Sequence, residues 1–234
     1  GLPRKNILPL HNKPLIQWTI DAALKSKLVN SIFVSTEDEE IARIASDAGA
    51  GILMRPKCLA GDTSQMSEVC RFMLRQITED LKLSPEVAVI LTPTCPLRTS
   101  QDIDGAIEVY LKYKKGCVFA GSIDRRHHWR TYEKTLEGEY ESADIGPENR
   151  QGRQYYKDID WLIEESGAIY VVGVNDYLTE GDFRLYPFHP YIMPKERCLD
   201  IDSIEDFDLA ASYLRERSNS FLLDNGQFIG EISV

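Results

Sequence analysis

The sequence has little that would support a disulfide framework, a structural zinc site or a membrane span. Its five cysteines are odd in number and widely scattered, and no two form a Cys-x-x-Cys pair. No apolar run approaches the roughly 18 residues that a membrane helix needs, and no signal-like segment begins the chain. We therefore expect a cytoplasmic protein with buried thiols and no membrane association.

Positive charge is also scarce, with 27 Lys and Arg residues against 37 Asp and Glu residues and a net charge of −10. This balance disfavours binding to nucleic acid or to an anionic membrane, so a polyanionic ligand must meet a local cationic site or a metal. Residues 1–6, Gly-Leu-Pro-Arg-Lys-Asn, offer such a site. The cations Arg4 and Lys5 with the amide of Asn6 suit a loop that holds phosphates; the alternative is a solvated basic end.

The first half of the chain alternates apolar strand-like runs with amphipathic stretches, which is typical of a parallel sheet covered by helices. The sequence thus predicts an α/β fold: a Rossmann-like, mainly parallel sheet with helices on both faces. The predicted strands are residues 31–34, 52–54, 87–91 and 117–120, and the predicted helices are residues 14–26, 37–48, 64–81 and a segment capped by Ser100.

The pattern breaks at residue 124, where a polar stretch begins that shows neither helical nor strand period. We interpret 124–166 as an inserted dimerisation and sugar-binding arm, and 1–123 with 167–218 as the nucleotide-binding domain. Regularity returns with a strand over 167–174 and a helix over 204–214 opened by Ser203. The tail, 219–234, contains an Asn225-Gly226 step that indicates a hairpin.

The segment Asp200-Ile201-Asp202 could bind a metal. In an extended chain the two carboxylates share one face while Ile201 points to the core. Two carboxylates completed by water and substrate phosphates suit Mg²⁺. In the alternative interpretation one Asp caps the following helix and the other is solvated.

Polar or stiff segments follow three of the predicted strands. Thr92 to Arg98 contains two prolines, and Ser35-Thr36 and Arg55-Pro56 end earlier strands. Ligands of doubly wound sheets lie beyond the carboxyl ends of the strands, so these segments are placed to line a pocket. The alternative is a rigid strand exit with Arg98 as a surface charge.

Taken together, these segments resemble the acylneuraminate cytidylyltransferases in order and spacing over nearly the whole chain. The matching pieces are residues 1–6, 12–16 (Asn-Lys-Pro-Leu-Ile), 34–38 (Val-Ser-Thr-Glu-Asp), Arg55-Pro56, Leu59-Ala60 with Asp62, 93–98 (Pro-Thr-Cys-Pro-Leu-Arg), Arg153-Gln154, 167–170 (Gly-Ala-Ile-Tyr) and 200–202 (Asp-Ile-Asp).

The resemblance implies a homodimeric enzyme that couples CTP to the anomeric hydroxyl of a nonulosonic acid, a sialic-acid-like sugar, and releases pyrophosphate with Mg²⁺. It implies that Lys5, Asp200 and Asp202 are catalytic and that the two aspartates bind the metal. Nucleotide contacts carried over from the family are Arg4, Lys5, Asn6, Arg55 and Thr92, and sugar contacts are Arg153, Gln154 and Tyr170.

The chain departs from the family pattern at three places. It lacks the opening strand and the Ala-Arg-x-x-Ser-Lys that precede the equivalent of Gly1, a loss expected to expose apolar surface. It has Thr92 and Cys95 where the family has Gln and Ser, and Glu164 where the family often has Arg. Two alternatives remain open: a related nucleotidyltransferase with a pseudaminic, legionaminic or keto-deoxy acceptor, and a non-catalytic dimeric remnant.

Overall fold

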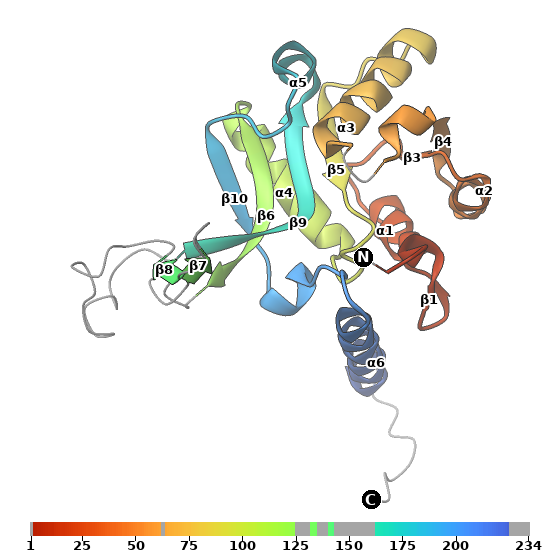
Figure 1. Cartoon of the computed structure of the whole chain (residues 1–234), viewed down its shortest axis with the longest axis vertical. Coiled ribbons are helices and arrows are strands. Elements are labelled where there is room, and N and C mark those ends of the chain that lie inside the picture. Colours follow the sequence, from red (N-terminus) through yellow and green to blue (C-terminus); the bar gives the residue numbers. More distant parts are fainter. Residues whose placement is uncertain (1, 62–63, 125–131, 135–139, 143–161, 225–234) are drawn as a thin grey trace, which may run out of the picture.

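In the computed structural model, helices and strands alternate along most of the chain (Figure 1), and the residues described are 2–61, 64–124, 132–134, 140–142 and 162–224. The strands are β1 (Pro9–Leu10), β2 (Lys13–Pro14), β3 (Phe33–Thr36), β4 (Gly51–Met54), β5 (Val87–Leu91), β6 (Cys117–Asp124), β7 (Tyr132–Lys134), β8 (Tyr140–Ser142), β9 (Leu162–Gly173) and β10 (Phe188–Ile192). The α-helices are α1 (Leu15–Leu24), α2 (Glu39–Asp47), α3 (Met66–Arg75), α4 (Ser100–Tyr113), α5 (Val174–Glu180) and α6 (Ile204–Asp224).

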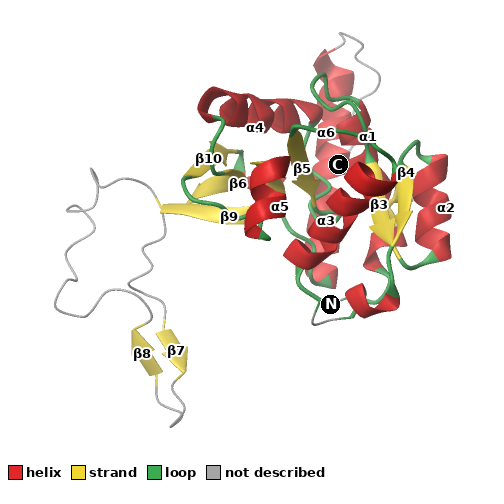
Figure 2. Cartoon of the chain, turned by 90° about the horizontal axis from the view of Figure 1, so that it is seen from above, coloured by secondary structure: helices red, strands yellow, loops and turns green. Residues whose placement is uncertain are grey.

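The main sheet has four strands in the order β10-β6-β9-β5. β10 pairs parallel with β6, while β9 pairs antiparallel with both β6 and β5. Three strands therefore run one way and β9, which returns from the predicted arm, runs the other. A separate pair, β3 and β4, is parallel, and β7 and β8 form an antiparallel pair drawn apart from the body in Figure 2.

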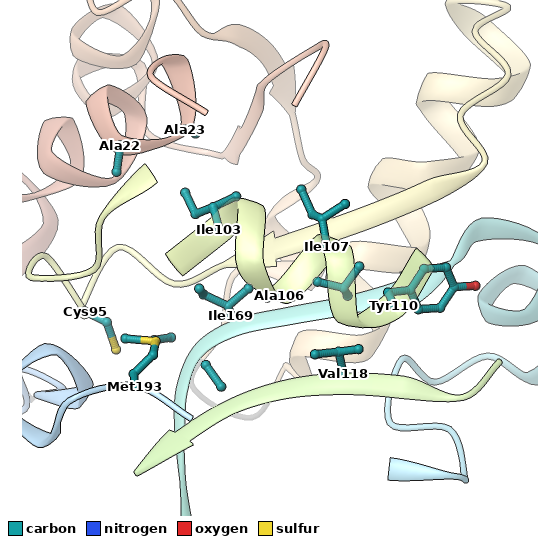
Figure 3. Packing of buried hydrophobic residues seen from close by; sticks show 13 residues of the cluster. Ala22, Ala23, Cys95, Ile103, Ala106, Ile107, Tyr110, Val118, Ile169 and Met193 are labelled. Carbon is teal, nitrogen blue, oxygen red and sulfur yellow. The ribbon is translucent and has the colours of Figure 1, made fainter. Parts of the chain in front are cut away.

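Helices cover both faces of the main sheet, which confirms the predicted fold class. On one face, α4 packs its apolar stripe against β6 and β9 (Figure 3), and the fully buried Ile103, Val118 and Ile169 meet there. On the other face, α3 and α5 cover the sheet through Leu74 and Tyr177. Burial of these apolar stripes is the main source of the fold's stability.

Helix α1 joins the two sheets. Its Ile16 and Ile20 belong to a cluster with α2, β3 and β4, whereas Ala22 and Ala23 belong to the cluster under α4. Between these regions, β5 pairs on one side only among the described strands, and all five of its residues are half-buried. Its side chains pack against the core clusters on the two faces of the sheet, so what β5 leaves unpaired among the described strands is one backbone edge.

Several predicted boundaries differ from the observed ones because capping groups decide where helices begin and end. Asp38 accepts hydrogen bonds from the backbone N–H groups of Glu40 and Ile41, so α2 starts after it. Thr99, not Ser100, caps α4 in a reciprocal capping box with Asp102. The predicted helix 64–81 consists of α3 followed by a π-helical turn, Gln76–Asp80.

The C-terminal region also corrects the sequence analysis. Helix α6 continues to Asp224, where a hairpin strand was expected, and the Asn225-Gly226 step lies outside the described residues. Most of the predicted arm, 124–166, lies outside them as well, so the division into domains stays a prediction. Among the helices described, none combines the length and apolarity that crossing a bilayer requires.

Candidate functional site

The N-terminal loop packs on the segment that carries the two aspartates. A short 3₁₀ turn, Lys5–Ile7, starts after Arg4, whose φ of 54° is in the left-handed region. Leu2 before the turn packs against a cluster that contains Leu97 and the fully buried Ile201. Segments from the two ends of the chain therefore meet beside the exit of β5.

Lys5 and Asp202, two of the predicted catalytic residues, are in direct contact. The ammonium of Lys5 donates to Asp202 Oδ1 at 2.9 Å and to the carbonyl of Ile201 at 2.8 Å. The Lys5 side chain is 22% exposed, whereas that of Asp202 is 77% exposed. The carboxylate thus has one oxygen on the lysine and remains open to solvent.

Asp200, Ile201 and Asp202 alternate as the sequence predicted: both aspartates are exposed and Ile201 is fully buried between them. The N–H of Ile201 donates to the carbonyl of Thr94 at 2.9 Å, which fixes this segment to the exit of β5. The described residues contain no group of three or more His, Cys, Asp or Glu that could hold a metal.

This donor set fits Mg²⁺ bound partly by substrate. Mg²⁺ typically takes one or two protein carboxylates and completes its shell with water and phosphate oxygens. Lys5 occupies Oδ1 of Asp202, and the 77% exposed carboxylate leaves its second oxygen to solvent. Asp200 and Asp202 are therefore suitable ligands, and phosphates would have to supply the others.

The other two predicted cations are engaged with acids near the end of β3. Arg4 pairs with Asp38 at 3.1 Å and with Glu40, at the start of α2. Arg55, directly after β4, pairs with Glu37 at 2.6 Å. The backbone N–H groups of α2 and the charge of Arg4 keep the pKa of Asp38 below its usual value.

Asn6 has a buried oxygen, Oδ1, without a hydrogen-bond partner in the described structure, and so does Ser35 at Oγ, near the end of β3. An unpaired buried polar group costs about 1–3 kcal/mol. Such atoms are suited to accept a partner from a ligand, and Asn6 was predicted to contact the nucleotide.

The side chains of Thr92 and Arg98 form hydrogen bonds that fix the segment following β5. The hydroxyl of Thr92 donates to the carbonyl of Gly167 at 3.1 Å. The guanidinium of Arg98 donates to the carbonyl of Ala168 at 2.8 Å, to the Thr92 carbonyl and to the hydroxyl of Thr19. Arg98 is 2% exposed, so its interpretation as a surface charge was wrong. Burial lowers its pKa to about 10, which leaves it charged at neutral pH.

Tyr170 lies in the core on the α3–α5 face of the sheet, and its hydroxyl donates to Glu165. Burial and the Glu165 carboxylate raise the pKa of this hydroxyl. Arg153 and Gln154, the other predicted sugar contacts, lie outside the described residues. Cys95 is fully buried, and burial raises its pKa to about 11, which is unsuited to a nucleophile.

The sequence analysis missed a buried ion pair next to the aspartates. Asp102, at the start of α4, is 1% exposed, and its Oδ2 lies 3.0 Å from Nε of Arg197. The pattern Thr99-x-x-Asp102 indicates a capping box. No sequence signal linked Asp102 to a residue 95 positions away.

One hollow on the described surface lies away from these residues. It has a volume of about 700 Å³ and mixed charge, and it is lined by the outer face of α4, the loop after α1 and Tyr191 of β10. No predicted site residue lines it.

Three comparisons place the chain among known proteins. The cytidylyltransferase family profile matches residues 1–211. An N-acylneuraminate cytidylyltransferase of Escherichia coli O18:K1:H7 is 32% identical over 96% of this chain and 51% of its own length, and one from Danio rerio is 32% identical over 90% and 47%. The chain spans about half the length of these relatives.

A shorter relative matches over most of both chains. The CMP-N,N′-diacetyllegionaminic acid synthase of Legionella pneumophila is 28% identical over 89% of this chain and 88% of its own length. Among solved structures, CMP:2-keto-3-deoxy-manno-octonic acid synthetase in complex with CTP has a TM-score of 0.64 at 12% identity, covering 92% of this chain and 93% of that one. This second likeness concerns the fold alone.

Proposed function

The chain belongs to the cytidylyltransferase family, and from that premise we propose that it transfers the cytidylyl group of CTP to the anomeric hydroxyl of a nonulosonic acid. The observation that supports the proposal best is the contact of Lys5 with Asp202, because it places beside the exit of β5 the cation that we assign to phosphate and a carboxylate that we assign to the metal. Ligands of α/β sheets bind beyond this edge.

The proposed reaction forms one phosphorus–oxygen bond and breaks another. The sugar hydroxyl attacks the α-phosphorus, loses its proton to solvent or a base, and the bond to the bridging oxygen of pyrophosphate breaks. Such a transfer needs alignment and charge neutralisation more than covalent help. In the proposal, Lys5 supplies part of this neutralisation when its ammonium passes from Asp202 to a phosphate oxygen.

Asp200 and Asp202 hold Mg²⁺ in this proposal. The bound ion would neutralise phosphate charge and orient the reacting phosphorus. Both carboxylates are exposed and their backbone is fixed by Ile201, which presents them toward a ligand at low entropic cost.

The remaining contacts are assigned by the family pattern. Asn6, with its unpartnered oxygen, would bind the nucleotide, and Arg4 and Arg55 would do so by exchanging their acidic partners for it. Thr92 would contribute through the backbone it fixes, because its hydroxyl donates to Gly167. We assign the sugar to Arg153 and Gln154, whereas Tyr170, 5% exposed with its hydroxyl on Glu165, would support the site from within the core rather than contact the sugar.

A legionaminic acid is the second candidate acceptor. It is favoured by the Legionella pneumophila relative, which matches over 88% of its own length. Both acceptors are acidic nine-carbon sugars, so the same chemistry serves either.

We also propose that the protein works as a homodimer in the cytoplasm. Support for the dimer comes from exposed apolar side chains on β10 and on the ends of β6 and β9 that approach the predicted arm, among them Phe188, Ile192, Ile123 and Ile163. Exposed apolar side chains gathered on neighbouring strands are typical of protein interfaces.

The proposal is tested by measuring pyrophosphate release from CTP and Mg²⁺ across a panel of nonulosonic and keto-deoxy acids. The assay uses residues 1–234 and a form preceded by the family's opening strand and phosphate-loop segment. We expect release with one acidic sugar by the extended form. Absence of release from both forms, shown to be folded, would leave the non-catalytic dimer as the better interpretation.

A matched pair of aspartate variants tests whether Asp202 is a metal ligand. Asp202→Asn should lower Mg²⁺-dependent turnover by about 10²-fold, a loss typical for removal of one electrostatic group. Asp208→Asn, an exposed position on α6, should leave turnover unchanged. Equal turnover of the two variants would refute the metal assignment.

A further inference from the structure

The segment after β10 carries Asp200 and Asp202 across the sheet edge and is attached to the junction between β5 and α4. Its start is fixed where the N–H of Met193 donates to the carbonyl of Gly121 at 2.8 Å. Near its end, the N–H of Ile201 donates to the carbonyl of Thr94. The two aspartate side chains are exposed, so their positions depend on how firmly this backbone is held.

Arg197 provides a second attachment to the same junction. It lies in a 3₁₀ turn, Lys195–Cys198, and its Nη2 donates to Asp102 Oδ1 at 3.1 Å while Nε lies 3.0 Å from Oδ2. Only the Nη2 contact has hydrogen-bond geometry, and Nε finds no hydrogen-bond partner in the described structure, so Arg197 is held by one charge-assisted hydrogen bond within a close ion pair.

Asp102 is itself held rigidly. Its Oδ2 accepts hydrogen bonds from the backbone N–H and the hydroxyl of Thr99, both at 2.8 Å. It is 1% exposed at the first turn of α4. Because Thr94 and Thr99 belong to one proline-stiffened turn, both attachments of the aspartate segment lead to the same rigid element.

We propose that the Asp102–Arg197 ion pair is a positioning device for the metal: it sets the backbone of Asp200-Ile201-Asp202 so that the two carboxylates are held ready for a divalent cation. In this proposal neither residue contacts the ion or the substrate. The inference rests on the metal assignment of the proposed function, and it goes beyond it by naming residues that the family pattern did not indicate.

The test measures metal binding directly, using Mn²⁺ as the probe and the free-ion electron paramagnetic resonance signal as the readout. The variants are Arg197→Met, Asp102→Asn and the double variant, in the full chain, below each variant's unfolding temperature. Residues that orient metal ligands typically contribute 10–100-fold to metal affinity, and we expect each single variant to weaken Mn²⁺ binding about tenfold.

The Mn²⁺ affinity of the double variant distinguishes positioning of the aspartates from a general loss of stability. Because both single changes break one pair, the double variant should bind Mn²⁺ about as weakly as either single one rather than about a hundredfold more weakly. Arg197→Lys, which keeps the charge but not the planar fork, should recover only part of the affinity. The matched control is Arg184→Met, which removes an exposed arginine 4.0 Å from Asp182.

Equal Mn²⁺ binding by wild type and Arg197→Met, including no binding by either, would overturn the inference. The outcome is independent of turnover: weakened Mn²⁺ binding by the variants, with no pyrophosphate release from either the wild-type chain or its extended form, would support the positioning role while refuting the proposed reaction. A lower unfolding temperature with unchanged Mn²⁺ affinity would indicate that the pair serves stability alone.

Discussion

At the scale of single residues, the cations near the candidate site are already paired. Lys5 forms an ion pair with Asp202, Arg4 with Asp38, and Arg55 with Glu37. In a protein with a net charge of −10, each of these cations has an acidic partner without a ligand. A phosphate ligand that binds these cations must therefore displace the carboxylates with which they are paired.

Lys5→Met is expected to have opposite effects on metal binding and on catalysis. Loss of the ammonium removes repulsion of roughly 1 kcal/mol, so Mn²⁺ should bind the nucleotide-free protein about fivefold more tightly. Turnover should fall about 10²-fold because phosphate charge is no longer neutralised. Free Mn²⁺ and pyrophosphate release are measured on one preparation, and weaker Mn²⁺ binding would contradict the competition.

Arg98→Met is expected to destabilise the fold by about 3 kcal/mol. The change removes hydrogen bonds to the carbonyls of Ala168 and Thr92 and leaves those groups buried with fewer partners. Urea unfolding gives the difference in free energy. Arg75→Met, at an exposed position on α3, should change it by less than about 0.5 kcal/mol, and a loss this small at Arg98 would show that its hydrogen bonds contribute little.

At the scale of elements, the start of α6 decides where Asp202 lies. Ser203 and Asp206 form a reciprocal capping box, with Asp206 N–H donating to Ser203 Oγ at 3.2 Å and Ser203 N–H donating to Asp206 Oδ2 at 2.9 Å. Asp206 Oδ2 also accepts from the N–H of Asp202 at 3.1 Å. The helix cap thus extends to the backbone of a proposed metal ligand.

Asp206→Asn should reduce stability at neutral pH and not in acid. Hydrogen bonds from Ser203 and Asp202 lower the pKa of Asp206 in the folded state. Its contribution is therefore complete above the unfolded value of about 3.9 and is lost as the pH falls below that value. We expect a difference of about 0.5 kcal/mol at pH 7 that vanishes near pH 2, measured by urea unfolding across this range.

Asp208→Asn on the same helix is the control for that measurement. Asp208 is exposed and lies beyond the first turn, so we expect no pH-dependent difference from wild type. A stability difference at Asp206 that stayed constant down to pH 2 would mean that its charge is not what supports the cap.

At the scale of the whole molecule, the two edge strands of the main sheet, β5 and β10, are each paired on one side only among the described residues. β5 is paired on one side and half-buried along its length. At the opposite edge, β10 exposes Phe188 and Ile192, and Tyr186 just before it is 84% exposed. Uncovered sheet surface favours association with a further strand or chain.

The proposed dimer predicts a mass twice the 26.6 kDa of the chain by light scattering. Replacing Phe188 with Glu and Ile192 with Lys should shift it to the monomer, since charges at an apolar interface core are strongly unfavourable. Leu81→Lys changes an equally exposed apolar residue, at the end of the π-helical turn, and should leave the mass unchanged. A monomeric wild type would refute the dimer.

The sequence by itself determined the alternation of strands and helices, the burial of Ile201 between two exposed aspartates, and the family, because each depends on periodicity or on motif order within short segments. It could not determine that Arg98 is buried, that Thr99 rather than Ser100 caps α4, or that the chain remains helical to Asp224. Those outcomes depend on competition between partners that folding brings together.

Only the tertiary structure decided how the candidate site is held. The contacts of Lys5 with Asp202 and of Arg197 with Asp102 join positions 197 and 95 residues apart in the chain. Each charge finds its partner through the path of the backbone around the sheet, and sequence spacing carries no information about that path. The residue types fixed which chemistry is available, and the fold selected which of these groups meet.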